Sequence, residues 1–186
     1  DRLAKTIEAL HPLTNEGRNA VLQIWSAHSA KRKVLITSAG EVEKYLYFVT
    51  EGSQRIMYND ERGRESTLVF SYPYSFGGSI GSFFLQAPSL YSFESLTRSA
   101  FLRASFQQVN DCMREHPSVS EAIRVGIMHA FCGLLDRMVE LQCFSSEEKF
   151  RQLLNRSPHI LSLVPHKYLA NYLGIDATNF SKLINS

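Results

Sequence analysis

Cysteine is scarce in this sequence, and its three positions follow no metal-binding or redox pattern. Cys112, Cys132 and Cys143 include no CxxC pair, and an odd number cannot all pair within one chain. This usage favours reduced thiols in a cytoplasmic protein. The six histidines show no HxH or HExxH spacing, so a metal-dependent enzyme lacks its ligands. No nucleophile–base arrangement stands out, and the sequence therefore predicts neither a metal site nor an enzyme.

Long apolar runs and a strong net charge are also missing. No apolar run approaches the roughly 20 residues that a membrane helix needs, and we expect no membrane contact. The first residues, DRLAKTIEALHP, carry charges throughout and do not resemble a signal peptide. A net charge of +2 does not by itself require a nucleic-acid partner. Any nucleic-acid binding must therefore come from charge that is concentrated locally.

Short segments rich in β-branched and aromatic residues fill the first half of the chain. Turn signals such as Glu51-Gly52 separate them, and Asn59–Gly63 has the composition of a hairpin tip. The Gly- and Ser-rich stretch 72–89 is not strand-like. Several short strands at regular spacing favour a sandwich or barrel. The predicted strands lie in KVLITSAGE, EKYLYFVTEG, both arms of SQRIMYNDERGRESTLVFSY, LYSFESL and AFLRASF.

Helical patterns flank this β-rich region. At the N-terminus we expect two short helices, the second capped by Thr14 and carrying Trp25 on its apolar face. After Phe106 the pattern is helical throughout, with a start signal at Pro117 and a stop at Ser145. An apolar stripe along a helix between two units packs either on the β-domain or against its own copy, and we expect the second. The predicted dimer stripe is Ile123, Ile127, Ala130, Leu134, Met138 and Leu141.

The last segment, 164–186, predicts two short helices joined by a tight turn. Gly174 stands where the first helix needs a left-handed stop, and Asp176 can cap the next helix. This is the helix-turn-helix pattern, in which the second helix enters the DNA major groove. Five apolar side chains are spaced to fill one small core: Leu169, Leu173, Ile175, Phe180 and Leu183.

The order of these features resembles the Crp/Fnr superfamily of bacterial transcription regulators, especially its Bacteroidetes-type members. The resemblance covers nearly the whole chain. It is carried by LYFVTEG at 46–52, by the 60–63 hairpin followed by STLVF, and by Ala87-Pro88-Ser89. FSSEEKFRQLL and VPHKYLANYLGI carry it through the C-terminal part. The family implies a cyclic-nucleotide-binding-like roll, a dimer helix and a DNA-binding domain.

The resemblance also implies an effector site, which departs here from the usual pattern. Members that bind cyclic AMP use a Glu for the ribose hydroxyl and, about ten residues later, an Arg for the phosphate. Here Ser79, Ile80 and Gly81 stand where the Glu is expected, and Ser89 and Leu90 stand where the Arg is expected. Cyclic-AMP binding by these contacts is therefore not expected. Either a different effector contacts the aromatic side chains of this segment, or those side chains fill the pocket. Arg98 and Arg103 could supply charge from another direction. The candidate effector residues are Gly78, Ser79, Gly81, Phe83, Ser89 and Tyr91.

On the second helix of the C-terminal motif, the apolar positions are used for packing. The remaining positions would face DNA, with Lys182 able to reach a guanine edge or a phosphate. Tyr168 and Arg156 are further candidates for phosphate contact. The predicted DNA-contact residues are Ala177, Thr178, Ser181, Lys182, Asn185 and Lys167.

We therefore predict an α+β transcription regulator in three parts. These are a double-stranded β-helix (jelly-roll) domain with N-terminal helices at 1–108, a long dimerisation helix at 109–144 and a helix-turn-helix domain at 145–186. The predicted partners are a two-fold symmetric DNA site, a second copy and RNA polymerase. No cofactor is identified, and the effector is unknown. The alternative is a cyclic-nucleotide-domain-like ligand- or protein-binding module without tight DNA binding.

Overall fold

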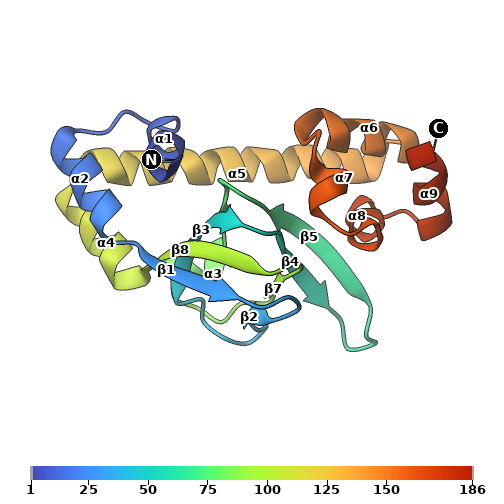
Figure 1. Cartoon of the computed structure of the whole chain (residues 1–186), viewed down its shortest axis with the longest axis horizontal. Coiled ribbons are helices and arrows are strands. Elements are labelled where there is room, and N and C mark those ends of the chain that lie inside the picture. Colours follow the sequence, from blue (N-terminus) through green and yellow to red (C-terminus); the bar gives the residue numbers. More distant parts are fainter. Residues whose placement is uncertain (1, 186) are drawn as a thin grey trace.

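The computed structural model describes residues 2–185 (Figure 1). Helix α5 (Pro117–Cys143) runs along most of the molecule. Its first half carries the N-terminal helices α1 (Arg2–Glu8) and α2 (Asn15–Gln23), with α4 (Phe106–Glu115) beside them. The strands lie under the middle of α5, and the C-terminal helices pack at its far end. The chain therefore forms three groups of elements along one helix.

Two four-stranded antiparallel sheets form a jelly-roll-like domain, with strand orders β1-β8-β3-β6 and β2-β7-β4-β5. Between them lies a core that includes Tyr47 and Phe101 from one sheet and Ile56 and Phe93 from the other. This arrangement follows from alternation, because every second side chain of a strand points to the same face. The strands are β1 (Ser26–Ala30), β2 (Leu35–Thr37), β3 (Tyr45–Glu51), β4 (Gln54–Asn59), β5 (Glu65–Ser71), β6 (Phe76–Gly77), β7 (Ser92–Ser95) and β8 (Ser99–Ser105).

The predicted strand segments are confirmed, but three details of the β-rich half differ from the prediction. Strand β1 was not predicted, because its sequence, SAHSA, contains no large apolar or β-branched residue. The Gly-rich stretch contains β6 and a short helix, α3 (Ile80–Leu85). Trp25 lies beyond α2, which ends at Gln23, and its ring lies 6.1 Å from that of Phe76.

Helix ends follow the capping signals in the sequence. The side chain of Thr14 accepts a hydrogen bond from the Gly17 amide at the start of α2. Ser105 and Ser145 each form a capping box, so residues 106–115 make a separate helix and α5 begins at Pro117 rather than at 109. The C-terminal helices are α6 (Ser146–Arg156), α7 (Ile160–Leu163), α8 (His166–Leu173) and α9 (Ala177–Asn185).

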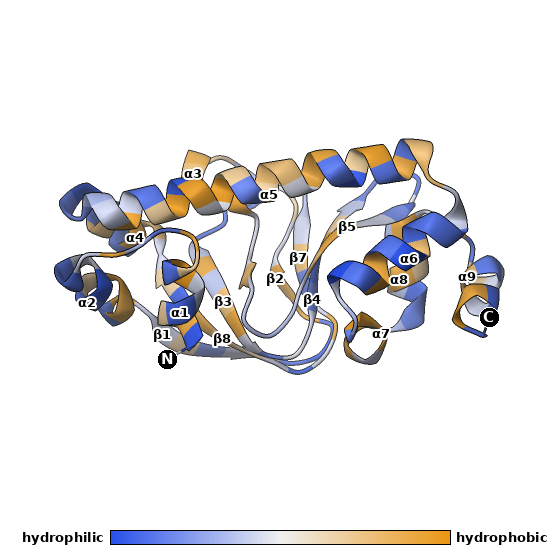
Figure 2. Cartoon of the chain, turned by 90° about the horizontal axis from the view of Figure 1, so that it is seen from above, coloured by the Kyte–Doolittle hydropathy of each residue, from blue (hydrophilic) through white to orange (hydrophobic). Residues whose placement is uncertain are grey.

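One side of α5 is apolar and exposed. Of the predicted stripe, Leu134 and Met138 are 52% and 54% exposed, whereas Ile123 is half-buried against the N-terminal helices. Hydrophobic colour follows much of the helix in Figure 2. Contrary to the sequence expectation, α5 is long and apolar enough to span a membrane, judged by length and composition alone. Charges at Arg124 and Asp136 interrupt its apolar run, but its average remains apolar. The exposed large apolar side chains on α5 are Ile127, Met128, Phe131, Leu134, Leu135, Met138, Val139 and Leu141.

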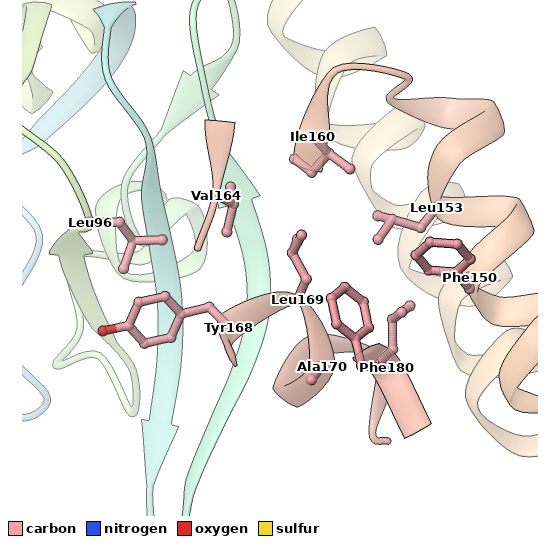
Figure 3. Packing of buried hydrophobic residues seen from close by; sticks show 10 residues of the cluster. Leu96, Phe150, Leu153, Ile160, Val164, Tyr168, Leu169, Ala170 and Phe180 are labelled. Carbon is pink, nitrogen blue, oxygen red and sulfur yellow. The ribbon is translucent and has the colours of Figure 1, made fainter. Parts of the chain in front are cut away.

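The C-terminal helices share one core, and the jelly roll contributes to it (Figure 3). Leu169, Leu173 and Phe180 are buried there as predicted, and Ile175 and Leu183 pack at its margin. Leu96, which follows β7, belongs to the same cluster and lies near Tyr168 in Figure 3. The C-terminal helices therefore pack on the jelly roll as well as on each other.

Candidate functional site

The predicted effector segment contains a pair of buried serines. Ser79, which precedes α3, and Ser89, in the loop after it, have hydroxyl oxygens 2.8 Å apart. The Ser89 hydroxyl also accepts a hydrogen bond from the Tyr91 amide at 3.0 Å. A neutral hydrogen bond therefore directly joins the two short stretches, 79–81 and 89–90, at which the family resemblance implied a Glu and an Arg.

A buried carboxylate, Glu43, lies beside this serine pair. Its Oε2 accepts hydrogen bonds from the Thr37 hydroxyl at 2.8 Å and from the Ser79 amide at 3.3 Å. Its Oε1 accepts from the Tyr45 amide at 3.3 Å, and the side chain is only 1% exposed. Within the described part of the chain, no Lys or Arg forms an ion pair with it. Burial raises the pKa of Glu43, and its hydrogen bonds offset only part of that effect.

Sequence reasoning missed Glu43, although one signal was available. The residue stands two positions before β3, in the string EVEKYLYFV, where an acid lies close to a strongly apolar strand. Gly78 lies beside it, and a β-carbon there would be in ordinary contact with Glu43 Oε2 at 3.4 Å. The same β-carbon would lie only 3.1 Å from the Tyr47 ring and 3.3 Å from the Tyr45 carbonyl. Together with the φ of +100°, these contacts favour glycine at this position.

The remaining predicted effector residues do not gather around one opening. Phe83 is fully buried, and its ring packs against Phe84 and Phe106 at centroid distances of 5.0 and 5.7 Å. Tyr91 is 39% exposed, and a β-carbon on Gly81 would meet open space. The structure therefore places Gly78, Ser79 and Ser89 near Glu43. Phe83 packs elsewhere in the core, and Tyr91 joins Ser89 through its backbone while its side chain is exposed.

The predicted DNA-contact residues share one exposed face. Gly174 ends α8 with a φ of +67°, and the Asp176 carboxylate accepts a hydrogen bond from the Asn179 amide at 2.8 Å, so both predicted caps are confirmed. A hollow of about 230 Å³ between α8 and α9 is lined by Lys167, Ala177 and Ser181 together with His166, Ala170, Phe180 and Ile184. All six predicted residues are exposed: Lys167, Ala177, Thr178, Ser181, Lys182 and Asn185.

Two of the proposed phosphate contacts have other partners in the structure. Tyr168 is only 7% exposed, and its ring lies 4.1 Å from the Arg55 guanidinium of β4. Arg156 forms an ion pair with Glu140 of α5. Each side chain therefore has a partner within the chain, while the Arg156 side chain is still 41% exposed. Phosphate contact by these two residues stays a prediction.

A buried polar network joins α5, α6 and α8. Glu140 accepts hydrogen bonds from Arg137 at 2.8 Å and from Arg156 at 3.0 Å. Burial alone would raise the pKa of Glu140, but these hydrogen bonds outweigh it and lower the pKa. Arg137 also donates to the Tyr172 carbonyl near the end of α8. The side of α5 opposite the exposed apolar residues is therefore fixed by charge to the C-terminal helices.

Comparison with known proteins identifies the central part of the chain. Residues 27–116 match the family model of the cyclic nucleotide-binding domain. This match covers just under half of the chain and indicates a fold of the cyclic nucleotide-binding type for the jelly roll and α4. A comparison with curated sequences finds no match.

Solved structures of Crp/Fnr-type regulators share the fold of this domain and extend the likeness beyond it. FixK2 from Bradyrhizobium japonicum is 16% identical with a TM-score of 0.75, covering 87% of this chain and 83% of that one. The c-di-GMP responsive global regulator CLP from Xanthomonas campestris is 16% identical with a TM-score of 0.67, covering 92% and 90%. The catabolite activator protein of Thermus thermophilus is 20% identical with a TM-score of 0.60, covering 95% and 84%. At these identities the likeness shows a shared fold.

The buried carboxylate in the cyclic nucleotide-binding domain predicts a pH dependence of stability. Because the pKa of Glu43 is raised above its ordinary value of 4.5, the folded state binds this proton more tightly than the unfolded state. Its contribution to stability is fully present below about pH 4.5 and is lost as the pH rises through the folded-state pKa. We expect the free energy of unfolding of wild type, relative to Glu43→Gln, to fall as the pH is raised from about 4 to about 8.

Urea unfolding of both proteins across that pH range measures the difference. Glu41→Gln is the matched control, because Glu41 is exposed and lies two residues away. A difference between wild type and Glu43→Gln that stays constant, or that grows in favour of wild type with rising pH, would contradict this assignment.

Proposed function

We propose that the chain is a homodimeric, effector-responsive DNA-binding transcription regulator of the Crp/Fnr type. It acts in the cytoplasm of a bacterium, with the sequence character of Bacteroidetes-type members, and catalyses no reaction. The observation that carries the proposal is the exposed face of α8 and α9, where the six predicted DNA-contact residues lie together. The three functional parts are the effector domain formed by the jelly roll and the helices α1, α2 and α4, the dimer helix α5 at Pro117–Cys143, and the DNA-binding domain formed by α6 to α9.

Helices α8 and α9 have the features that a helix-turn-helix needs. A turn of three residues, with Gly174 in the left-handed conformation, lets α9 leave α8 at a sharp angle. The buried faces of both helices pack into the C-terminal core, so the outward face of α9 is held rigidly. In this proposal Lys182 contacts a guanine edge or a phosphate, and Thr178 and Ser181 offer hydroxyls to base edges. Lys167 binds the DNA backbone, which supplies affinity independent of sequence.

Dimerisation through α5 supplies a second copy of this weakly charged face. The predicted stripe residues Ile127, Leu134, Met138 and Leu141 are exposed, and the other large apolar side chains of the helix widen the surface. A membrane-spanning role for α5 is disfavoured, because its other face buries Arg137 and Glu140 against the C-terminal helices. A parallel pair of such helices would place two copies of α9 about one DNA turn apart, roughly 34 Å, as a two-fold site requires.

The effector remains to be identified, and we propose that it is not recognised through the usual contacts to a cyclic phosphate. Ser79 and Ser89 leave no positive charge to neutralise that phosphate, and the neighbouring Glu43 would repel it. RNA polymerase is a further partner in this proposal, as it is for transcription activators in general.

The alternative function is a binding module of the cyclic-nucleotide-domain type without tight DNA binding. The thin charge on α9 favours it, because Lys182 is the one basic side chain that this helix contributes. The two functions differ in whether the chain selects a DNA sequence.

Substitution of Lys182 tests the DNA-binding assignment. The probe is a palindromic duplex enriched from random sequence by repeated rounds of binding to the full chain. Lys182→Ala should weaken binding by roughly 5- to 100-fold, the value of one base or phosphate contact, as measured by fluorescence anisotropy at several salt concentrations. Lys5→Ala is the matched control, because Lys5 is also exposed but lies on α1 at the other end of the molecule. Equal affinities of wild type and Lys182→Ala would contradict the assignment, and failure to enrich any duplex would favour the alternative function.

Titration with cyclic AMP tests the effector proposal. We expect no binding heat in calorimetry and no change in melting temperature at about 1 mM ligand. The melting test is sensitive, because a ligand at 100 times its dissociation constant stabilises a protein by about 2.7 kcal/mol. Micromolar binding would overturn the interpretation of Ser79 and Ser89.

A further inference from the structure

Strand β5 stands at the edge of its sheet, and a side chain from α8 pairs with its open side. Asn171 Oδ1 accepts a hydrogen bond from the Thr67 amide at 2.6 Å, and Asn171 Nδ2 donates to the Glu65 carbonyl at 2.7 Å. The sheet order ends at β5, and within residues 2–185 no other strand pairs with this edge. Open edges are sites at which sheets accept new hydrogen-bonding partners. The carboxamide of Asn171 is therefore such a partner.

The geometry matches the backbone pattern of a sheet. Glu65 and Thr67 are two residues apart, so the carbonyl of one and the amide of the other point to the same side of the strand. A residue on a neighbouring parallel strand would bond to the same two groups. The planar Asn171 carboxamide presents an acceptor oxygen and a donor amino group. It therefore bonds to the Thr67 amide and the Glu65 carbonyl at the same time.

A buried cation holds α8 against the same strand pair. Arg55 of β4 is 2% exposed and donates to both carboxylate oxygens of Glu65, at 2.6 and 2.9 Å, and to Glu94 at 2.7 Å. Its guanidinium lies 4.1 Å from the centre of the Tyr168 ring. Tyr168 therefore covers an arginine that is already paired on its other sides, and the contact requires no unpaired charge.

Three further contacts fix the orientation of the C-terminal helices on the jelly roll. The Tyr72 hydroxyl lies 2.8 Å from that of Ser157, and the Ser53 hydroxyl donates to the Leu163 carbonyl at 2.7 Å. Phe70 of β5 lies 5.1 Å from the ring of Tyr172. The Arg137 guanidinium of α5 lies 4.1 Å from the same ring. Tyr172 is therefore in contact with both the jelly roll and the dimer helix.

The docked helices leave their predicted DNA face uncovered. Asn171 and Tyr172 point to β5 and α5, whereas Lys167 and Lys182 remain exposed. Docking on β5 therefore orients this face without hiding it.

We propose that the edge of β5 is the docking strand that positions the helix-turn-helix for DNA, with Asn171 as the positioning residue. The proposal rests on the proposed function. A movement of β5 moves α8 directly, because two hydrogen bonds to the strand backbone join them.

Asn171→Leu tests this, since leucine keeps the size and charge of asparagine but removes both hydrogen bonds. Hydrogen exchange of the full chain is measured first, and it requires no DNA. The Thr67 amide and the amides of α8 should exchange at least about fivefold faster in the variant, as expected for the loss of hydrogen bonds of ordinary strength. Asn19→Leu on exposed α2 is the matched control. Asn171→Asp is a second variant, because it keeps the acceptor for Thr67 and places a carboxylate against the Glu65 carbonyl.

DNA binding is measured next with the enriched duplex. Asn171→Leu should bind roughly three- to tenfold more weakly, because the helices must first return to the docked position. The dependence of affinity on salt should not change, because no phosphate contact is lost. Unchanged exchange at Thr67 in Asn171→Leu overturns the docking strand, whereas Asn171→Asp should keep Thr67 protected. Faster exchange with equal or tighter DNA binding overturns the positioning role. If the wild type binds no duplex, but the Thr67 amide still exchanges faster in Asn171→Leu than in wild type, the proposed function is refuted and the docking strand is retained.

Discussion

The exposed apolar side of α5 is the constraint on which the account of this protein depends. Burial of one large apolar side chain contributes about 1.5–3 kcal/mol, and α5 exposes several of them in a row. Association of two chains costs an estimated 4–15 kcal/mol in lost freedom, and in the proposed dimer the burial of several such side chains would offset this cost. The opposite side of the helix cannot serve instead, because Arg137 and Glu140 are buried there in a charged network. One side of α5 is thus available for the proposed pairing, and the other side holds the C-terminal helices.

The same helix links the other parts of the chain. Its first turns bury Val119 and Ala122 among the N-terminal helices, and its last turns hold α8 through Arg137. The jelly roll makes its own connection to α8 through β5 and Asn171. Helices α8 and α9, to which we assign DNA binding, are therefore held at two points, one on α5 and one on the jelly roll. A movement of β5 relative to α5 would therefore shift α8.

Much of this fold could be predicted from local sequence signals. Gly174 and Asp176 act as the caps that their residue types predicted, and the β-branched runs of β3, β4, β5, β7 and β8 form strands. Strand β1 gave no such signal, because small and polar residues form it through pairing with β8. In α5, charged residues interrupt the apolar run, so the sequence did not indicate that the helix as a whole is apolar enough to span a membrane. Local sequence patterns thus predicted most of the helices and strands. The errors lie where pairing with a distant strand determines the structure.

The site was less predictable, because its key contacts join residues that are distant in the chain. Asn171 and Thr67 are separated by 104 positions, and nothing near either residue indicates the other. Glu43 could be suspected from the apolar strand that follows it, but its partner Ser79 could not. The exposed DNA face was predictable as a set, since helical periodicity assigns outward positions once the buried ones are known. The effector site was predicted by resemblance, and its six residues lie in two environments rather than one.

Sedimentation equilibrium of the full chain, alone and with the enriched duplex, tests whether two chains pair through α5. Wild type should sediment at twice the 21.1 kDa of one chain at micromolar concentration and bind the duplex as two copies. Leu134→Glu should sediment as a folded monomer with unchanged circular dichroism and lose DNA binding, because a charge then stands in the centre of the apolar stripe. Leu35→Glu, at a similarly exposed leucine on β2, should remain dimeric. A monomeric wild type, or a Leu134→Glu variant that still sediments as a dimer, would contradict the account.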